Sequence, residues 1–333
     1  NINCSFDGPA GWTCEFTTDN GTYPFGQMDS VQVASGDSTE ISMTINPNNF
    51  NGSGAATLEF ESKNGPGIVG SVTVNYITNT GVHLLVVDAS EDGYASMISG
   101  ALDNFYTGIY GVVSRSALQV PGLDLSYFTM ISWSAGNSTP AFYQEEVNNL
   151  QNYLDQGGNL LLNGQNVGED IFEPSGQSQF AQSFFNNYLH ANYVADIGPS
   201  FFMRGIDSDP ITDGIVFSLQ ATYTMHPDEI SPFDANANTI ITFGSGPPVN
   251  SIKADDGNHR VVYFGIGFEQ INDGQGIVDT LVTRSVRWLT EVIVLYNPHD
   301  NSVVSTYRLD QYYPNPFKPS TMITYSLAEE VNV

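Results

Sequence analysis

Five polar side chains that could bind a ligand or take part in catalysis follow buried segments in the middle of the chain. They are Asp88, Ser134, Gln165, Asn166 and Glu169. Ligands of open α/β sheets bind beyond the carboxyl ends of the strands, so these residues are the candidate lining of a cleft for a sugar or a peptide. Neither Ser132 nor Ser134 lies in a Gly-x-Ser-x-Gly elbow, and a serine nucleophile is therefore not predicted.

The histidines do not form a known metal-binding motif. None is spaced as His-Glu-x-x-His or joined to a cysteine pair, so no zinc site is predicted. The five are His83, His190, His226, His259 and His299. His190 follows a predicted helix, and we expect it to cap that helix or to pack in the core.

Several acidic residues stand close enough in the sequence to offer oxygen ligands to calcium. The groups are Asp88 with Glu91 and Asp92, Glu169 with Asp170, Asp207 with Asp209, and Asp255 with Asp256. None matches the twelve-residue calcium loop, and residues 255–258 are typical of a hairpin turn. Calcium is therefore the one cofactor that the sequence leaves open, with its ligands unknown. Paired carboxylates could also hydrolyse glycosides, but their separation across a cleft is not visible in a sequence.

The two cysteines, Cys4 and Cys14, lie close together in a segment with Gly and Pro. A disulfide across so short a loop would stabilise the fold by about 2 to 3 kcal/mol. The alternative is two free thiols in a reducing cytosol. We expect the disulfide, because the polar surface described next suggests an oxidising exterior.

The charge balance excludes two classes of partner. The 333 residues include 9 Lys+Arg and 36 Asp+Glu, a formal net charge of −27, which nucleic acids and anionic membranes repel. No apolar run approaches the ~20 residues of a membrane helix, so membrane insertion is not expected. Only 14% of the residues are charged, so Asn, Ser, Thr, Gln and Gly must supply much of the surface. We expect an extracellular or cell-surface protein whose export signal has been removed.

The elements that must position these residues fall into three parts. Residues 1–80 contain short alternating runs between Gly, Asn, Pro and Ser clusters, and predict an Ig-like β-sandwich. In residues 81–295, continuous apolar runs alternate with helical patterns, which predicts a doubly wound parallel sheet with helices on both faces. Thr139 is the expected N-cap of one helix, and further helices are expected over 177–190 and 277–292. Residues 296–333 predict a linker, a Pro-rich turn and a short β segment.

The middle part resembles the class I glutamine-amidotransferase-like α/β domains. The resemblance is carried by residues 83–88, 131–134, 150–168 and 188–191, and it implies a flavodoxin-like or amidotransferase-like fold. Enzymes of that class place a nucleophilic Cys directly after the strand that 159–163 represents. Here the turn reads Gly164-Gln165-Asn166-Val167-Gly168, and no cysteine occurs from 81 to 333. A Cys-His-Glu triad cannot be assembled, so enzyme activity stays uncertain and a non-catalytic domain is favoured.

The tail reads Tyr312-Tyr313-Pro314-Asn315-Pro316-Phe317-Lys318-Pro319-Ser320-Thr321-Met322-Ile323, then Tyr325-Ser326-Leu327. It resembles the opening of the C-terminal sorting domain of type IX secretion cargo proteins, which continues well beyond this length. The resemblance implies export by the type IX machinery of a Bacteroidota-like bacterium. Ile323, Tyr325 and Leu327 predict a strand that either folds back on the chain's own sandwich or adds to a sheet of a second copy.

These observations favour an exported, non-catalytic structural or adhesive protein of the outer cell surface or extracellular space. Its expected partners are copies of itself, with assembly into a filament or sheath through the terminal strand. The alternative is a secreted hydrolase or an enzyme accessory module that binds a sugar or peptide in the α/β cleft. An open cleft with converging polar groups would favour this alternative.

Overall fold

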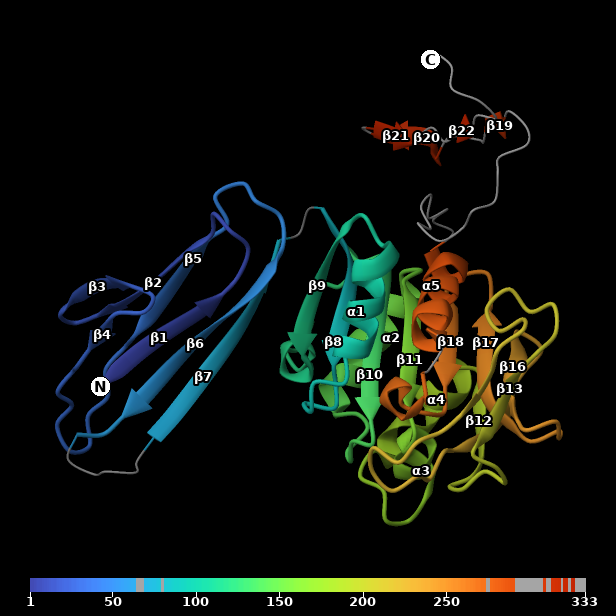
Figure 1. Ribbon diagram of the computed structural model, residues 1–333. Coiled ribbons are helices and arrows are strands. Elements are labelled where there is room, and N and C mark those ends of the chain that lie inside the picture. The colour runs from blue at the N-terminus through green and yellow to red at the C-terminus, as the bar shows by residue number, and fades with distance from the viewer. Residues whose placement is uncertain are drawn as a thin grey trace. The chain divides into compact units, whose positions relative to one another are not determined.

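The computed structural model describes residues 1–63, 69–78, 81–273 and 276–290, together with the backbone of short strands between 308 and 326 (Figure 1). By compactness the chain divides into Asn1–Val294 and Leu295–Val333. The predicted boundary between 80 and 81 falls within the first unit, between strands β7 (Val69–Ile77) and β8 (Val82–Asp88).

The first 77 residues form two antiparallel sheets. The strand orders are β4-β1-β6-β7 and β3-β2-β5. The remaining bounds are β1 (Ile2–Asp7), β2 (Thr13–Thr18), β3 (Gly21–Pro24), β4 (Met28–Asp29), β5 (Ser42–Asn46) and β6 (Ser53–Glu61). One core joins side chains of both sheets, among them Ile2, Phe16 and Leu58, because alternate residues of a strand point to the same side. This part is all-β, as predicted.

Cys4 on β1 and Cys14 on β2 meet in that core. They are buried free thiols, and their Sγ atoms lie 3.8 Å apart. Burial raises the pKa of Cys4, and burial together with the neighbouring thiol raises the pKa of Cys14 to about 12. The disulfide between Cys4 and Cys14 stays a prediction, and the closeness of the two sulfur atoms is compatible with it.

An eleven-stranded sheet forms the centre of the α/β part. Its main path is β14-β13-β16-β17-β18-β11-β10-β8-β9, and β12 pairs with β15 beside β17. The bounds are β9 (Ile109–Ser114), β10 (Met130–Gly136), β11 (Asn159–Gly164), β12 (Ala191–Ala195), β13 (Phe202–Gly205), β14 (Val216–Ser218), β15 (Glu229–Pro232), β16 (Ala237–Phe243), β17 (Val249–Asp255) and β18 (Arg260–Phe264).

The prediction of a parallel sheet is correct for only one side of this sheet. Strands β9, β8, β10, β11 and β18 are parallel, whereas β17, β16, β13 and β14 continue it antiparallel. Short turns join β16 to β17 and β17 to β18, and a short turn can connect only antiparallel strands. The sheet is therefore mixed rather than doubly wound throughout.

Helices cover both faces of the sheet (Figure 1). α1 (Ser96–Phe105) and α5 (Ile277–Thr290) lie on one face, and α2 (Gln144–Asp155), α3 (Val167–Phe172) and α4 (Gln182–Asn187) on the other. Three short 3-10 helices are η1 (Arg115–Leu118), η2 (Gln179–Ala181) and η3 (Phe268–Gln270). On β8, Leu85 and Val87 pack on the α2 side, while Leu84 and Val86 pack on the α1 side. This two-sided burial explains the continuous apolar run.

Two helix predictions need correction. α2 begins at Gln144 rather than after Thr139, because Glu146 accepts the backbone amide of Tyr143 at 2.8 Å and caps the helix there. The helix expected over 177–190 is shorter and is divided into η2 and α4.

The described strands of the tail pair with one another. β20 (Tyr313–Lys318) pairs with β21 (Ser320–Met322), and β19 (Arg308–Leu309) with β22 (Tyr325–Ser326). The Pro-rich segment expected as a turn is therefore a strand, which pairs only through its non-proline ends Tyr313 and Lys318; prolines are tolerated where no ladder bond is needed. Of the predicted assembly strand, Tyr325 lies in β22, and Ile323 and Leu327 lie outside the described residues.

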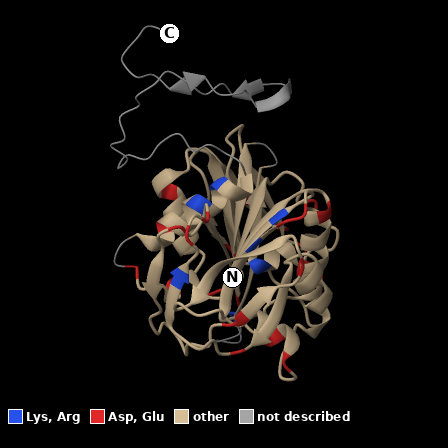
Figure 2. Ribbon diagram, turned by 90° about the vertical axis from the view of Figure 1, so that its right-hand side faces the viewer, with Lys and Arg blue, Asp and Glu red and all other residues tan. Residues whose placement is uncertain are grey.

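Acidic residues are spread over loops and element ends of the α/β part (Figure 2), with the few basic residues scattered between them. In the described part of the chain, no helix has the length and apolar character needed to cross a membrane.

Candidate functional site

The carboxyl ends of the five parallel strands form one edge of the sheet, here called the carboxyl edge. Along the chain, β9 lies on one side of β8, whereas β10, β11 and β18 follow on its other side. The order of strands therefore switches between β8 and β10, and ligands of α/β folds bind at such a switch point. Asp88 ends β8 and stands opposite Ser134 of β10. Gln165, Asn166 and Glu169 follow β11. The structure therefore brings all five predicted residues to the same edge.

The side chains of Asp88 and Ser134 both form hydrogen bonds within the protein. The carboxylate of Asp88 accepts the hydroxyl of Ser90 at 2.7 Å and the amide of Gly93 at 2.9 Å, which shapes the loop after β8. Ser134 is 1% exposed and donates to Oδ1 of Asn163 at 3.4 Å. Its partner is an amide rather than a histidine, so Ser134 lacks the general base that a serine nucleophile needs.

Gln165 occupies the position at which the amidotransferase resemblance expects the nucleophile. Its side chain is buried, and its amide nitrogen donates to the carbonyl oxygen of Thr224 at 2.8 Å. Its amide oxygen accepts the backbone amide of His226 at 3.0 Å and Nε2 of Gln270 at 2.7 Å. Gln165 thus ties together the turn after β11, the 222–228 segment and η3.

Beside Gln165, Glu169 forms an acidic group with Asp196 and His226. Burial raises the pKa of Glu169, and the charge of Asp196 raises it further, while His226 lowers it. Nδ1 of His226 lies 3.2 Å from the Asp196 carboxylate, and these two side chains are 39% and 30% exposed. The group is open to solvent and can exchange protons or hydrogen-bond a hydroxyl-rich ligand.

Asp228 lies beneath this group and is fully buried. Burial raises the pKa of Asp228 well above its usual range, although the amide of Gly168 opposes the shift. That amide donates to Oδ2 of Asp228 at 2.6 Å. A Cβ at position 168 would stand 2.5 Å from the Tyr193 ring. Glycine at this position therefore lets the backbone amide approach the Asp228 carboxyl. Burial therefore disfavours the charged form of Asp228.

A second buried acid, Glu269, follows β18 near the switch point. Burial raises the pKa of Glu269, and the Tyr223 hydroxyl, which donates to Oε1 at 2.5 Å, partly offsets this. A Cβ at Gly267 would stand 2.0 Å from Oε1 and one at Gly136 3.3 Å from it. Two glycines therefore leave the space that the carboxyl fills.

The partners of the histidines limit the chemistry of the α/β part. One ring nitrogen of each of His190, His226 and His259 lies against a carboxylate or a carbonyl oxygen. A histidine acts as the base for a nucleophile when it contacts a hydroxyl or a thiol. The described contacts suit proton exchange and ligand hydrogen bonding better than acyl transfer.

The acidic pairs considered for calcium are used in other contacts. Asp209 pairs with Lys253 and accepts the amide of Ile211 at 2.9 Å. Asp255 accepts Nε of Arg260 at 2.8 Å. Calcium binding stays a prediction without an assigned site.

Several residues of the carboxyl edge were missed in the sequence analysis. Glu269 and Gln270 follow β18 within a few residues, so the rule applied to the other strand ends would have found them. Asp196 follows β12, Asp228 precedes β15 and His226 lies two residues before Asp228; these two short strands were not predicted from the sequence.

No protein-family model matches this sequence, and no curated protein matches it. Among the solved structures that are similar to this chain, three are as follows. A carbohydrate deacetylase is 15% identical with a TM-score of 0.42, and the match covers 63% of this chain and 32% of that one, so this chain spans about a third of its length. A cytoplasmic protein from Salmonella typhimurium is 11% identical with a TM-score of 0.43, covering 71% and 96%. A glutamine amidotransferase from Thermotoga maritima is 10% identical with a TM-score of 0.39, covering 64% and 99%.

Proposed function

We propose that this chain is an exported, non-catalytic structural or adhesive protein of the cell surface or extracellular space. The observation that carries the proposal is Gln165. A buried amide whose oxygen and nitrogen both bind the protein holds three segments together at the position where a related enzyme would need a free nucleophile. The site is built for stability rather than for attack on a substrate.

The finer assignments of fold belong to the same proposal. The order β9-β8-β10-β11-β18 and the turn after β11 support a divergent amidotransferase-like domain. The two sheets of the N-terminal part and their shared core support an Ig-like sandwich, a common spacer in surface proteins. The tail motif from Tyr312 to Leu327 supports export by type IX secretion.

The tail also supports self-assembly through strand addition. Its described strands form two-stranded ladders, β19 with β22 and β20 with β21. Such ladders have outer edges with backbone donors and acceptors to offer, and strand addition from another copy would pair them. A contact of this kind between the tail of one copy and a sheet of the next does not close, and it produces a filament.

Negative-stain electron microscopy of the full chain beside a version that ends at Asn297 tests the assembly. We expect filaments from the full chain and dispersed particles from the shortened one. Dispersed particles from both, with monomers alone in mass photometry over a wide concentration range, would reject assembly and leave the tail as a secretion signal.

A second candidate function, ligand binding at the carboxyl edge, is favoured by one observation. Glu169, Asp196 and His226 form a solvent-accessible group with a raised pKa for Glu169. Thermal-shift measurements with a panel of neutral oligosaccharides and short peptides test it. A ligand that raises the melting temperature of the native chain but not of Glu169→Gln would support a binding module.

A further inference from the structure

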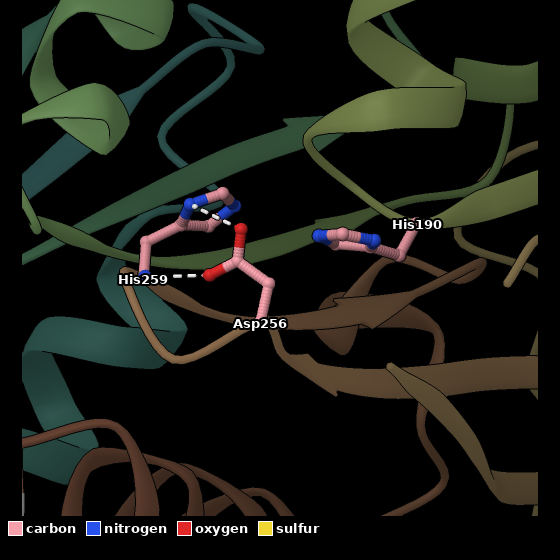
Figure 3. A group of neighbouring side chains, drawn as sticks. All are labelled: His190, Asp256 and His259. Atoms are coloured by element: carbon pink, nitrogen blue, oxygen red, sulfur yellow. Dashed lines mark hydrogen bonds and ion pairs between the residues drawn. The ribbon is translucent and has the colours of Figure 1, made fainter. Parts of the chain in front are cut away.

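Two buried histidines and one carboxylate meet at the opposite edge of the sheet, where the parallel strands begin (Figure 3). His259 directly precedes β18, Asp256 lies in the turn between β17 and β18, and His190 lies between α4 and β12. One ligand atom from each lies within 4.8 Å of the others. In Figure 3 the ring of His190 points toward the Asp256 carboxylate.

The ring of His190 is held in a defined tautomer. Its Nδ1 lies 2.8 Å from the Asp234 carboxylate, which can only accept when ionised, so Nδ1 carries the proton. Hydrogen bonding to His190 contributes to the lowered pKa of Asp234, against the opposing effect of burial. Nε2 of His190 is left as a lone pair, and it is buried without a hydrogen-bond partner.

The ring of His259 is held in the complementary way. Its Nε2 lies 3.2 Å from the carbonyl oxygen of Tyr188, and a carbonyl only accepts, so Nε2 carries the proton. In the neutral ring Nδ1 is then a lone pair. It is buried without a hydrogen-bond partner, and the side chain is 3% exposed.

Asp256 completes the group with a charged oxygen. Its Oδ1 accepts the amides of Asn258 and His259 at 2.8 and 2.9 Å, which fixes the carboxylate in the turn. Its Oδ2 lies 3.5 Å from Nδ1 of His259, and the side chain is 25% exposed. Two nitrogen lone pairs and one carboxylate oxygen therefore face one another, with a route from solvent past Asp256.

We propose that Nε2 of His190, Nδ1 of His259 and Oδ2 of Asp256 bind one zinc-class divalent transition metal. Two imidazole nitrogens and one carboxylate oxygen are a donor set for zinc rather than calcium, with water as the fourth ligand. Tetrahedral zinc with bonds of about 2.1 Å needs its ligand atoms about 3.4 Å apart, which side-chain movements of about 1 Å achieve. Asp234 and the Tyr188 carbonyl orient the two rings from behind, as outer partners of metal-bound histidines do.

The bound metal would act as a structural clip. It joins the β17–β18 turn to the segment between α4 and β12, two pieces of chain that are distant in sequence. The site lies away from the carboxyl edge, where ligands of α/β sheets bind, so its expected effect is on stability.

Isothermal titration calorimetry of the untagged full chain with Zn²⁺ tests the proposal. We expect one equivalent to bind, and a rise in melting temperature that a chelator reverses. His190→Gln and His259→Gln should weaken zinc binding at least about 10-fold. Asp234→Asn keeps all three ligands and should weaken it by about 10-fold through the orientation of His190. Co²⁺ in place of zinc should give the intense visible absorption of four-coordinate cobalt.

Matched controls separate this site from other zinc binding. Asp255→Asn changes the neighbouring acid, which pairs with Arg260, and His83→Asn changes an exposed histidine; both should bind zinc as the native chain does. Two neighbouring thiols can also bind zinc, so Cys4→Ser with Cys14→Ser is a further control. This double variant should still bind one equivalent, because the proposed ligands are unchanged. Absence of zinc binding to the folded native chain, equal binding by His259→Gln, or equally tight binding of Ca²⁺ would overturn the proposal.

Discussion

The two edges of the parallel sheet both hold buried polar atoms without hydrogen-bond partners, but these atoms differ in chemistry. At the carboxyl edge they include carboxyl oxygens of Asp228 and Glu269. At the opposite edge they are ring nitrogens of His190 and His259. A buried carboxyl can take up a proton and become neutral, whereas a neutral imidazole whose other nitrogen already donates has only a lone pair to offer.

This chemical difference indicates which edge of the sheet would bind a cation. The carboxyl edge accommodates its buried acids without a cation, because burial raises the pKa of Asp228 and of Glu269 and so favours their neutral forms. The opposite edge presents lone pairs and a negative charge that a cation would complete. The edge at which the fold leads one to expect a ligand is therefore not the edge whose buried atoms need a cation.

The largest expected effect comes from breaking the network at Gln165. Gln165→Ala would leave three buried or partly buried partners without their bonds and open a cavity, which should cost about 3 kcal/mol in the free energy of unfolding. Urea unfolding measures this change in the free energy of unfolding. Gln179→Ala removes an exposed side chain with a single 3.0 Å bond and should change stability by less than about 0.5 kcal/mol. Equal stabilities of the two variants would show that Gln165 is not a structural tie.

The pH dependence of stability tests the neutral state of Asp228. Its pKa is raised in the folded protein above the unfolded value of about 4, so its stabilising contribution is complete below that value and is lost as the pH rises through the folded pKa. Asp228→Asn removes this loss. We expect its stability relative to the native chain to rise by about 1.4 kcal/mol per pH unit between pH 4 and the folded pKa.

Urea unfolding at pH 5, 6 and 7 gives that difference. Asp207→Asn changes a side chain that is 80% exposed, and its difference from the native chain should not vary with pH. A flat difference for Asp228→Asn as well would mean that the Asp228 carboxyl is ionised.

The smallest expected effect is the coupling between the two edges. Gln165 follows the six-residue strand β11 and His259 precedes the five-residue strand β18, so the two lie at opposite ends of neighbouring strands, about 20 Å apart. Zinc should raise the stability of Gln165→Ala and of the native chain equally, within about 0.5 kcal/mol. Melting curves with and without zinc check this. A larger difference would mean that the two edges are coupled through the sheet.

Much of the architecture could be predicted from local patterns. Continuous apolar runs at 83–88 and 159–162 correspond to β8 and β11, which are buried on both faces, and the helix expected over 277–292 corresponds to α5. The strand-end rule brought Asp88 and Gln165 to one edge. The hairpin turn expected over 255–258 is present between the antiparallel strands β17 and β18. The rest of the antiparallel half was missed, because a buried strand has the same apolar pattern in either direction and only the connection decides which it is.

Composition and local pattern were enough to predict the acidic charge, the alternation of strands and helices, and the lack of a cysteine nucleophile in residues 81–333. This was possible because composition, periodicity and a single residue's chemistry need no partner. The tertiary structure was needed to show that both the oxygen and the nitrogen of the Gln165 amide are hydrogen-bonded. It was also needed to show that His190 lies beside His259, about seventy residues later in the chain. Hydrogen-bond partners and metal-ligand distances depend on which segments fold together, and histidines in separate loops carry no spacing signal of their own.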